Sequence, residues 1–268
     1  MDFFQAILIA IVEGLTEYLP VSSTAHMIFT SSFFGIQNDD FVKLFQVSIQ
    51  FGAILAVVVL YWKKFFDFSK INFYIKLACA VMPALVLGKL FDDKIEAVLG
   101  SPIPIAIVLI FGGFVLLFID RFFRHPSIHV EEDITIKKAV TIGFWQCLAM
   151  MPGTSRSAAS IIGGMQQGLS RKTAAEFSFF LAVPTMLAVT AYSVFLKTYE
   201  TTQLKGYELL LQGDNIKFFL IGNVIAFIVA VLAIKLFIEV IKKYGFKPWG
   251  YYRIVAGIIL LLYFSLNK

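Results

Sequence analysis

The residues best suited to chemistry lie in the stretch EGLTEYLPVSSTAH, from Glu13 to His26, inside otherwise apolar sequence. Glu13 and Glu17 are four residues apart and therefore share one face of a helix. Pro20 interrupts that helix. Acidic side chains in membrane segments usually face the protein interior and mark a functional site. The alternative is a helix that lies at the membrane surface with its acids in water.

Hydroxyl residues follow the interruption. Ser22, Ser23 and Thr24 are suitable N-caps for the next helix, whose first turn carries free N–H groups. Such a turn attracts anions, phosphate above all. His26 lies in the same turn and belongs to the residue type that titrates near neutrality. The stretch therefore combines a predicted anion site with a group that can move a proton.

A second stretch, PGTSRSAAS from Pro152 to Ser160, has similar chemistry. Arg156 adds a fixed positive charge, and its planar fork suits phosphate oxygens. The accompanying hydroxyls are Thr154, Ser155 and Ser157. We expect both stretches to form one site for a phosphate-like anion. A structural ion pair between Arg156 and one of the two glutamates is the alternative, and it does not exclude function.

Composition identifies the setting of this site. Of 268 residues, 59% are hydrophobic and only 15% are charged, and the mean hydropathy is +0.81. These values predict an all-α polytopic membrane protein. The net charge of +5 is interpreted as basic loops that face the cytoplasm rather than as a nucleic-acid surface. Cys79 and Cys147 lie in apolar runs and are expected to be packing residues.

Six apolar runs are predicted to be full transmembrane helices, and two further segments are interrupted. The full spans are 44–62, 72–90, 103–119, 174–195, 216–238 and 250–266. Segment 2–34 breaks at Pro20, and segment 138–169 breaks at Pro152. Each should form a helix, a break and a second helix. Backbone freed in this way is tolerated within a membrane only where it is protected or lines a wet cavity.

The two halves of the chain resemble each other. An offset of 132 residues superposes Pro20 on Pro152, Ser23 on Ser155 and Phe45 on Phe177. Each half contains one broken segment followed by three spans. The sequence therefore predicts a single membrane domain, 1–268, with repeat one at about 1–120 and repeat two at about 133–268.

Loop charges suggest how the halves are oriented. If both broken segments are re-entrant helix pairs, three spans in each half give the repeats inverted topology. Basic residues then gather on one side, at the loops that follow the first, third and fifth spans and beside the second broken segment. The excess predicts that this side is cytoplasmic and that both termini are outside. The meeting point of the broken helices is the expected site.

EGLTEYLPVSSTAH and PGTSRS resemble the two motifs of the bacterial undecaprenyl-diphosphatase family, also known for bacitracin resistance, and the resemblance extends over the whole chain. Glu13 and Glu17 match the paired-acid motif of that family. The serine-histidine stretch is matched by Ser22, Ser23, Thr24 and His26, and the serine-arginine motif by Ser155 and Arg156. Ala158 and Ser160 depart from the usual glycine and threonine.

The resemblance implies an integral membrane phosphatase that converts undecaprenyl diphosphate to the monophosphate, recycling the lipid carrier for wall synthesis. It also implies dependence on Mg²⁺ or Ca²⁺, a site reached from the outer face, and a dimer. We expect Glu13 and Glu17 to bind the cation, and Arg156 and the helix N-termini to hold the diphosphate. Ser23 is the candidate nucleophile, although it could instead orient water. His26 or a glutamate is the proton acceptor, and spacing does not decide between them.

A transporter or flippase for a phosphorylated lipid or anion is the main rival, because inverted repeats with broken helices also suit transport. The acid, serine and histidine opposite an arginine exceed what binding alone requires and favour hydrolysis. Elsewhere, His125 and His129 are expected in a solvated loop. Arg253, beside two tyrosines, is expected to be an interfacial anchor.

Overall fold

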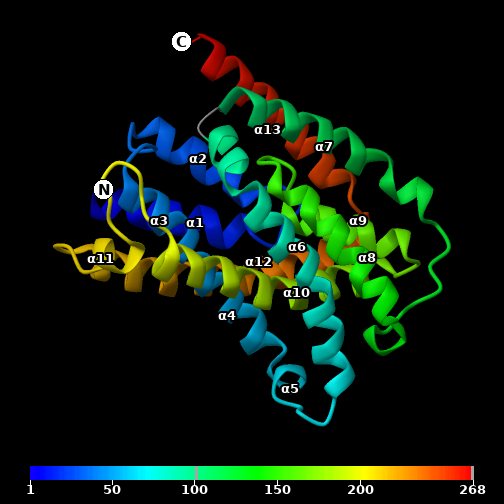
Figure 1. Ribbon diagram of the computed structural model, residues 1–268. Coiled ribbons are helices and arrows are strands. Elements are labelled where there is room, and N and C mark those ends of the chain that lie inside the picture. Colours follow the sequence, from blue (N-terminus) through cyan, green and yellow to red (C-terminus); the bar gives the residue numbers. More distant parts are fainter. Residues whose placement is uncertain (100–101, 267–268) are drawn as a thin grey trace.

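The computed structural model describes residues 1–99 and 102–266, without the side chains of 92–99, and every regular element in these ranges is helical (Figure 1). The elements are α1 (Phe3–Thr16), α2 (Ser23–Phe33), α3 (Asp40–Ser48), α4 (Gln50–Leu60), α5 (Trp62–Phe65), α6 (Ile71–Leu99), α7 (Pro102–Phe122), η1 (Glu131–Asp133), α8 (Ile136–Gln146), η2 (Cys147–Met150), α9 (Arg156–Gln166), α10 (Arg171–Ala191), η3 (Tyr192–Leu196), α11 (Gly206–Leu210), α12 (Asn215–Tyr244) and α13 (Lys247–Leu266).

Within the described ranges, six helical segments are long and apolar enough to cross a membrane, and they coincide with the predicted spans. They are Asp40–Leu60, Ile71–Phe91, Pro102–Phe122, Arg171–Leu196, Asn215–Tyr244 and Lys247–Leu266. The first begins earlier than predicted because the Asp39 carboxylate accepts a hydrogen bond from the Val42 N–H at 3.1 Å and caps α3. The chain is thus a multi-pass membrane protein.

Both interrupted segments form a helix, a break and a second helix, as predicted. In the first, α1 ends at Thr16 and α2 begins at Ser23. In the second, α8 continues through η2, and α9 begins at Arg156. The helices on the two sides of each break contact each other.

The helix starts of the two broken segments are offset by one residue more than the 132 residues of the sequence prediction. α1 begins at Phe3 and α8 at Ile136, while α2 begins at Ser23 and α9 at Arg156. The offset is therefore 133 residues for both helices of the broken segments. The difference arises at the break itself, where one residue lies between Pro20 and the cap Ser22 but two lie between Pro152 and the cap Ser155. Ser23 therefore corresponds to Arg156 rather than to Ser155.

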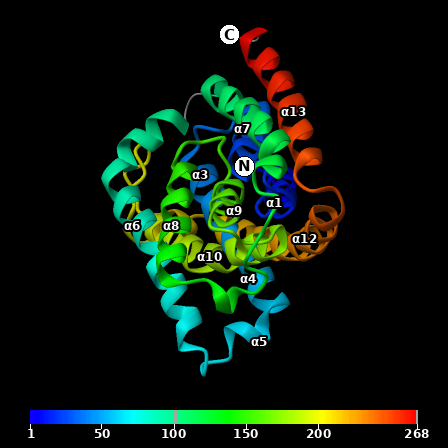
Figure 2. The ribbon, with the colours of Figure 1, turned by 90° about the vertical axis from the view of Figure 1, so that its right-hand side faces the viewer.

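Helices of the two halves exchange contacts in a reciprocal pattern. The first broken segment packs on the second half through α1 and α12, and the second packs on the first half through α8 and α6. The last spans of the two halves, α7 and α13, pack along each other, as both ribbon views show (Figures 1 and 2). Close approach requires glycine, because a Cβ at Gly52 of α4 would overlap the Asn223 carbonyl oxygen of α12. The inverted membrane orientation of the halves stays a prediction.

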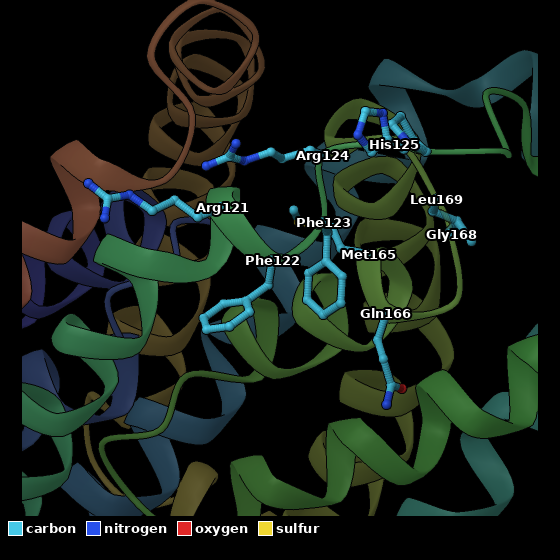
Figure 3. A pocket seen from close by; sticks show the side chains of 10 residues that line it. Arg121, Phe122, Phe123, Arg124, His125, Met165, Gln166, Gly168 and Leu169 are labelled. Atoms are coloured by element: carbon cyan, nitrogen blue, oxygen red, sulfur yellow. The ribbon is translucent and has the colours of Figure 1, made fainter.

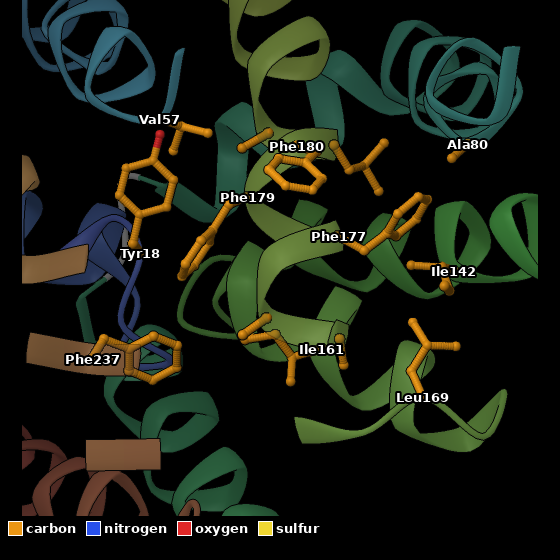
Figure 4. Close-up of a cluster of buried hydrophobic side chains, with 14 of the residues drawn as sticks. Tyr18, Val57, Ala80, Ile142, Ile161, Leu169, Phe177, Phe179, Phe180 and Phe237 are labelled. Atoms are coloured by element: carbon orange, nitrogen blue, oxygen red, sulfur yellow. The ribbon is translucent and has the colours of Figure 1, made fainter. Parts of the chain in front are cut away.

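The largest buried cluster lies around α10 (Figure 4). Phe177, Phe179 and Phe180 of α10 are almost wholly buried. Tyr18, from the first break, packs edge-on against Phe179 at 5.0 Å between ring centroids, and its hydroxyl donates to the Ala53 carbonyl at 3.0 Å. This apolar contact anchors the first break against the second half of the chain.

Candidate functional site

The two breaks meet at three side chains that the sequence singled out. Ser23 Oγ donates to Glu17 Oε2 at 2.6 Å, and Arg156 Nη2 donates to Glu17 Oε1 at 2.7 Å. Glu17 is only 5% exposed and Ser23 only 6% exposed. The ion pair considered as an alternative is therefore present, but it involves the same carboxylate that accepts the hydrogen bond of the serine hydroxyl. The carboxylate of Glu17 thus contacts both Arg156 and Ser23.

Helix geometry places Ser23 and Arg156 equivalently, as the first residue of α2 and of α9. The preceding residues, Ser22 and Ser155, have left-handed φ values of 69° and 77°. Their hydroxyls accept the N–H groups of Ala25 (3.4 Å) and Ala158 (3.2 Å) as N-caps. Two helix N-termini with their positive dipole ends are thus presented beside the buried ion pair, which suits a multiply charged anion.

Arg156 is held from several sides. Its Nη1 donates to the Ser178 carbonyl at 2.9 Å, and its guanidinium carbon lies 5.7 Å from the centre of the Tyr18 ring. Its buried Nε–H has no hydrogen-bond partner within the described residues. A buried donor without an acceptor is costly. The free Nε–H is therefore suited to an incoming anionic oxygen.

Glu13 differs from Glu17 in having no partner. It is completely buried, and neither carboxylate oxygen accepts a hydrogen bond within the described residues. Two unpartnered hard oxygens fit a divalent cation, and Glu17 retains lone pairs on the same helix face. No group of three or more His, Cys, Asp or Glu side chains gathers within the described ranges. Mg²⁺ commonly takes one or two carboxylates and completes its shell with water and substrate phosphate oxygens, so the residues fit.

His26 contacts the last span rather than Ser23. Its Nδ1 lies 2.8 Å from the Ser22 carbonyl oxygen, and its Nε2 lies 2.8 Å from the hydroxyl of Tyr252. The two rings are stacked, with centroids 5.6 Å apart and planes inclined by 13°. A carbonyl can only accept, so Nδ1 carries a proton and the Nε2 of a neutral ring accepts from Tyr252. The Ser23 hydroxyl donates its hydrogen bond to Glu17 and not to His26. This contact favours a glutamate over His26 as the proton acceptor.

The remaining predicted hydroxyls have different surroundings. Ser157 is fully buried, and its hydroxyl donates to the Leu19 carbonyl at 2.8 Å, so it ties the second break to the first. Ser155 lies 3.0 Å from Ser157 between their hydroxyl oxygens. Thr24 and Thr154 are half-buried, and within the described residues neither hydroxyl has a hydrogen-bond partner. Ser157 therefore has a structural role, and the two threonines have free hydroxyls for a ligand.

The position of Arg253 differs from the interfacial anchor that its sequence context predicted. It is fully buried instead of interfacial, and it donates to backbone carbonyls in both breaks. Its immediate neighbours, two tyrosines, are typical of a membrane boundary and suggested an anchor. A better signal lies elsewhere in the sequence. Gly112 and Gly113 of α7 leave room for this side chain, since a Cβ on Gly112 would overlap the guanidinium.

Other candidates lie away from these residues. His125 and His129 are exposed in the loop after α7, as expected. A cavity of about 310 Å³ lies beside His125 and is bordered by Arg121 and Arg124 at the end of α7 and by Met165 and Gln166 of α9 (Figure 3). None of the predicted site residues borders it.

The chain is similar to known proteins over almost its whole length. A family model described as bacitracin resistance protein BacA matches residues 6–259. The undecaprenyl-diphosphatase of Flavobacterium psychrophilum is 56% identical over 262 residues, which cover 98% of this chain and 96% of that protein. The undecaprenyl-diphosphatase of Porphyromonas gingivalis is 48% identical over 279 residues, with coverage of 98% and 96%. That of Campylobacter jejuni is 42% identical over 268 residues, with coverage of 99% and 96%.

Proposed function

We propose, on the premise that the chain belongs to the bacitracin resistance protein BacA family, that it is a membrane phosphatase that hydrolyses undecaprenyl diphosphate to undecaprenyl phosphate and inorganic phosphate. Relatives named for this activity match it over almost their whole length. The product is the lipid carrier in the form that wall-polymer synthesis reuses. The observation that carries the chemistry is the chain of hydrogen bonds from Ser23 through Glu17 to Arg156.

In the first step, Ser23 Oγ attacks the terminal phosphorus. A bond between Oγ and phosphorus forms, the anhydride P–O bond breaks, and undecaprenyl phosphate leaves with the bridging oxygen. Glu17 Oε2, at 2.6 Å, takes the serine proton. A water molecule then attacks the phosphoserine, Glu17 returns its proton to Oγ, and inorganic phosphate is released.

Positioning and charge neutralisation supply most of the catalysis in phosphoryl transfer. Arg156 offers its free Nε–H to a terminal phosphate oxygen, and the first turns of α2 and α9 offer backbone N–H groups. Thr24 and Thr154 offer hydroxyls. Because Nε2 of the neutral His26 ring accepts from the Tyr252 hydroxyl, His26 takes a proton from the attacking water in the second step through that hydroxyl, which gives its own proton to Nε2 as it accepts one from the water.

Glu13 and Glu17 are the residues that would hold a divalent cation, Mg²⁺ or Ca²⁺. Such an ion neutralises negative charge on the diphosphate oxygens when it is bound. Without it, Glu13 retains two buried oxygens that accept no hydrogen bond from the part of the chain that the structure describes, which is the feature that favours a cation at this position.

A phosphate-release assay tests the function. Detergent-purified protein should release inorganic phosphate from a long-chain prenyl diphosphate in the presence of Mg²⁺ or Ca²⁺, where no membrane gradient exists to drive transport. Ser23→Ala should abolish both turnover and any trapped phosphoenzyme. Persistent turnover in that variant would favour direct attack by water. An inactive wild-type protein that still binds the lipid would favour the transporter or flippase.

For the membrane arrangement we propose a bacterial plasma-membrane enzyme with re-entrant broken segments, inverted repeats, both termini outside, a site open to the outer face, and a homodimer. The reciprocal packing of α1 on α12 and of α8 on α6 supports the repeats. Asp120, at the end of α7, binds both Arg171 of α10 (2.6 Å) and the Phe246 N–H before α13 (2.8 Å), and the proximity of these three helix ends supports the proposed orientation. A tag at the C-terminus that proves accessible only from the cytoplasm would contradict it.

A further inference from the structure

Arg253 of α13 connects three parts of the chain through its guanidinium. Nη1 donates to the Pro20 carbonyl (3.1 Å) in the first break and to the Thr154 carbonyl (2.9 Å) in the second. Nη2 donates to the Gly153 carbonyl at 2.7 Å. Nε donates to Leu109 of α7 at 3.1 Å, and Nη2 also lies 3.5 Å from the Val108 carbonyl. One side chain thus binds the backbone of both breaks.

The chemistry of this arrangement is specific to arginine. The guanidinium has five N–H donors in a planar fork, and five backbone carbonyls surround it. Lysine, with three donors on one nitrogen, cannot span carbonyls on opposite sides of the fork. All five acceptors are neutral, so the positive charge stays uncompensated by any carboxylate in direct contact. That charge contacts the backbone of both breaks. The helices that follow these breaks begin with Ser23 and Arg156.

We infer that Arg253 is a positioning residue for the proposed reaction, setting the separation of the two breaks so that Ser23 and Glu17 of the first half face Arg156 of the second. The distances leave little freedom. Pro20 lies three residues before Ser23, and Thr154 lies two residues before Arg156, and a single Nη1 atom binds both carbonyls. A displacement of this nitrogen therefore moves the first residues of α2 and α9 relative to each other.

This inference rests on the proposed hydrolysis, because the rate of that reaction is what the experiment measures. Arg253 is fully buried beneath the break backbone and donates to no predicted site side chain. Its loss should therefore reduce kcat, because the serine and the guanidinium of Arg156 no longer align in the transition state. KM should change little. Misplacement of reacting groups by about 1 Å can reduce a rate by about 100-fold.

Two variants perturb Arg253 in different ways. Arg253→Lys keeps the charge and removes the fork. Gly112→Ala keeps Arg253 itself, but the added Cβ would overlap its guanidinium and displace it from the carbonyls. Gly257→Ala is the matched control. It also lies in the contact between α7 and α13, where its Cβ would meet Ile110 Cγ1 at 2.5 Å, but it leaves the guanidinium alone.

The experiment measures kcat, KM and thermal stability for the three purified variants and the wild type. We expect Arg253→Lys and Gly112→Ala to lower kcat by about 10- to 100-fold with KM within about threefold, and Gly257→Ala to lower stability while retaining kcat. If kcat follows stability equally in all three, or if both test variants fail to fold, Arg253 is merely structural and the inference is overturned. An inactive wild type would instead contradict the proposed function.

Discussion

Glu17 occupies the decisive position at the scale of single residues. One carboxylate oxygen accepts a hydrogen bond from the Ser23 hydroxyl, and the other accepts a hydrogen bond from the Arg156 guanidinium. The guanidinium pairs with the Glu17 carboxylate, whereas Glu13, one turn earlier, is buried and its carboxylate accepts no hydrogen bond within the described residues. The two glutamates of one motif therefore have different surroundings. In the proposed reaction Glu17 takes the serine proton in addition to its share in the cation site, whereas Glu13 serves the cation alone.

Glu17→Gln tests this division. The amide keeps the size of the side chain but cannot take the Ser23 proton or neutralise Arg156. We expect kcat for phosphate release to fall by about 100- to 10,000-fold, the usual range for loss of a positioned acid or base. The exposed Glu200 provides the control variant, Glu200→Gln, which should keep full activity. Near-normal turnover of Glu17→Gln would exclude Glu17 as the proton acceptor.

Tyr252 gives a second prediction at this scale. Tyr252→Phe keeps the ring that stacks on His26 but removes the hydroxyl bonded to Nε2. Because a single hydrogen bond contributes about 1 kcal/mol, activity should fall by about fivefold. Tyr251→Phe, at an exposed neighbour, should have no effect. Equal activities of the two variants in the phosphate-release assay would show that the hydroxyl does not assist His26.

At the scale of elements, the breaks form because proline ends each helix, and they persist because their backbone groups find partners. An unsatisfied buried carbonyl costs about 1–3 kcal/mol. Arg253 satisfies carbonyls in both breaks, while Ser157 satisfies the Leu19 carbonyl. Ser22 and Ser155 then begin the following helices from a left-handed conformation that serine rarely adopts. The strained caps lie immediately before Ser23 and Arg156, as strain often does at functional sites.

The cap at Ser155 provides the prediction for this scale. Ser155→Ala removes the hydroxyl that accepts the Ala158 N–H but keeps a Cβ at φ 77°. Ser155→Gly removes the same hydroxyl and relieves the strain. We expect Ala to destabilise the protein by about 1 kcal/mol and Gly by clearly less. Thermal unfolding in detergent measures both. A larger loss for Gly than for Ala would argue against strain at this position.

At the scale of the whole molecule, the two halves hold each other's broken segments. Reciprocal packing of this kind needs close helix contacts, and glycines provide them. The Asn223 side chain of α12 accepts the Gly52 N–H at 2.7 Å, so the α4 backbone lies directly against α12. The exposed large side chains, such as Phe111, Leu232 and Leu262, lie on the outer helices, where a membrane would cover them.

Gly52→Ala should therefore weaken the contact between α4 and α12 and lower the free energy of unfolding. Its Cβ would lie within 2.8 Å of the Asn223 backbone, and relieving such overpacking costs about 1–3 kcal/mol. Gly88→Ala is the matched control, since its Cβ would meet only Met150 Cε at 3.7 Å. Alanine there should be neutral or stabilising by about 1 kcal/mol. The melting temperatures of both variants in detergent check the prediction, and equal values would contradict it.

Local features of the sequence predicted the six spans, the two breaks and the polar residues Glu17, Ser23 and Arg156 that meet beside them. Apolar runs and prolines act through nearby backbone and solvent, so their effects can be read from the chain alone. Tertiary packing decided which partners those residues have. Ser23 bonds to Glu17 instead of His26, and Glu17 is paired across 139 residues with Arg156. Arg253 turns inward because glycines on α7 leave room for it, a cause that lies outside its own helix.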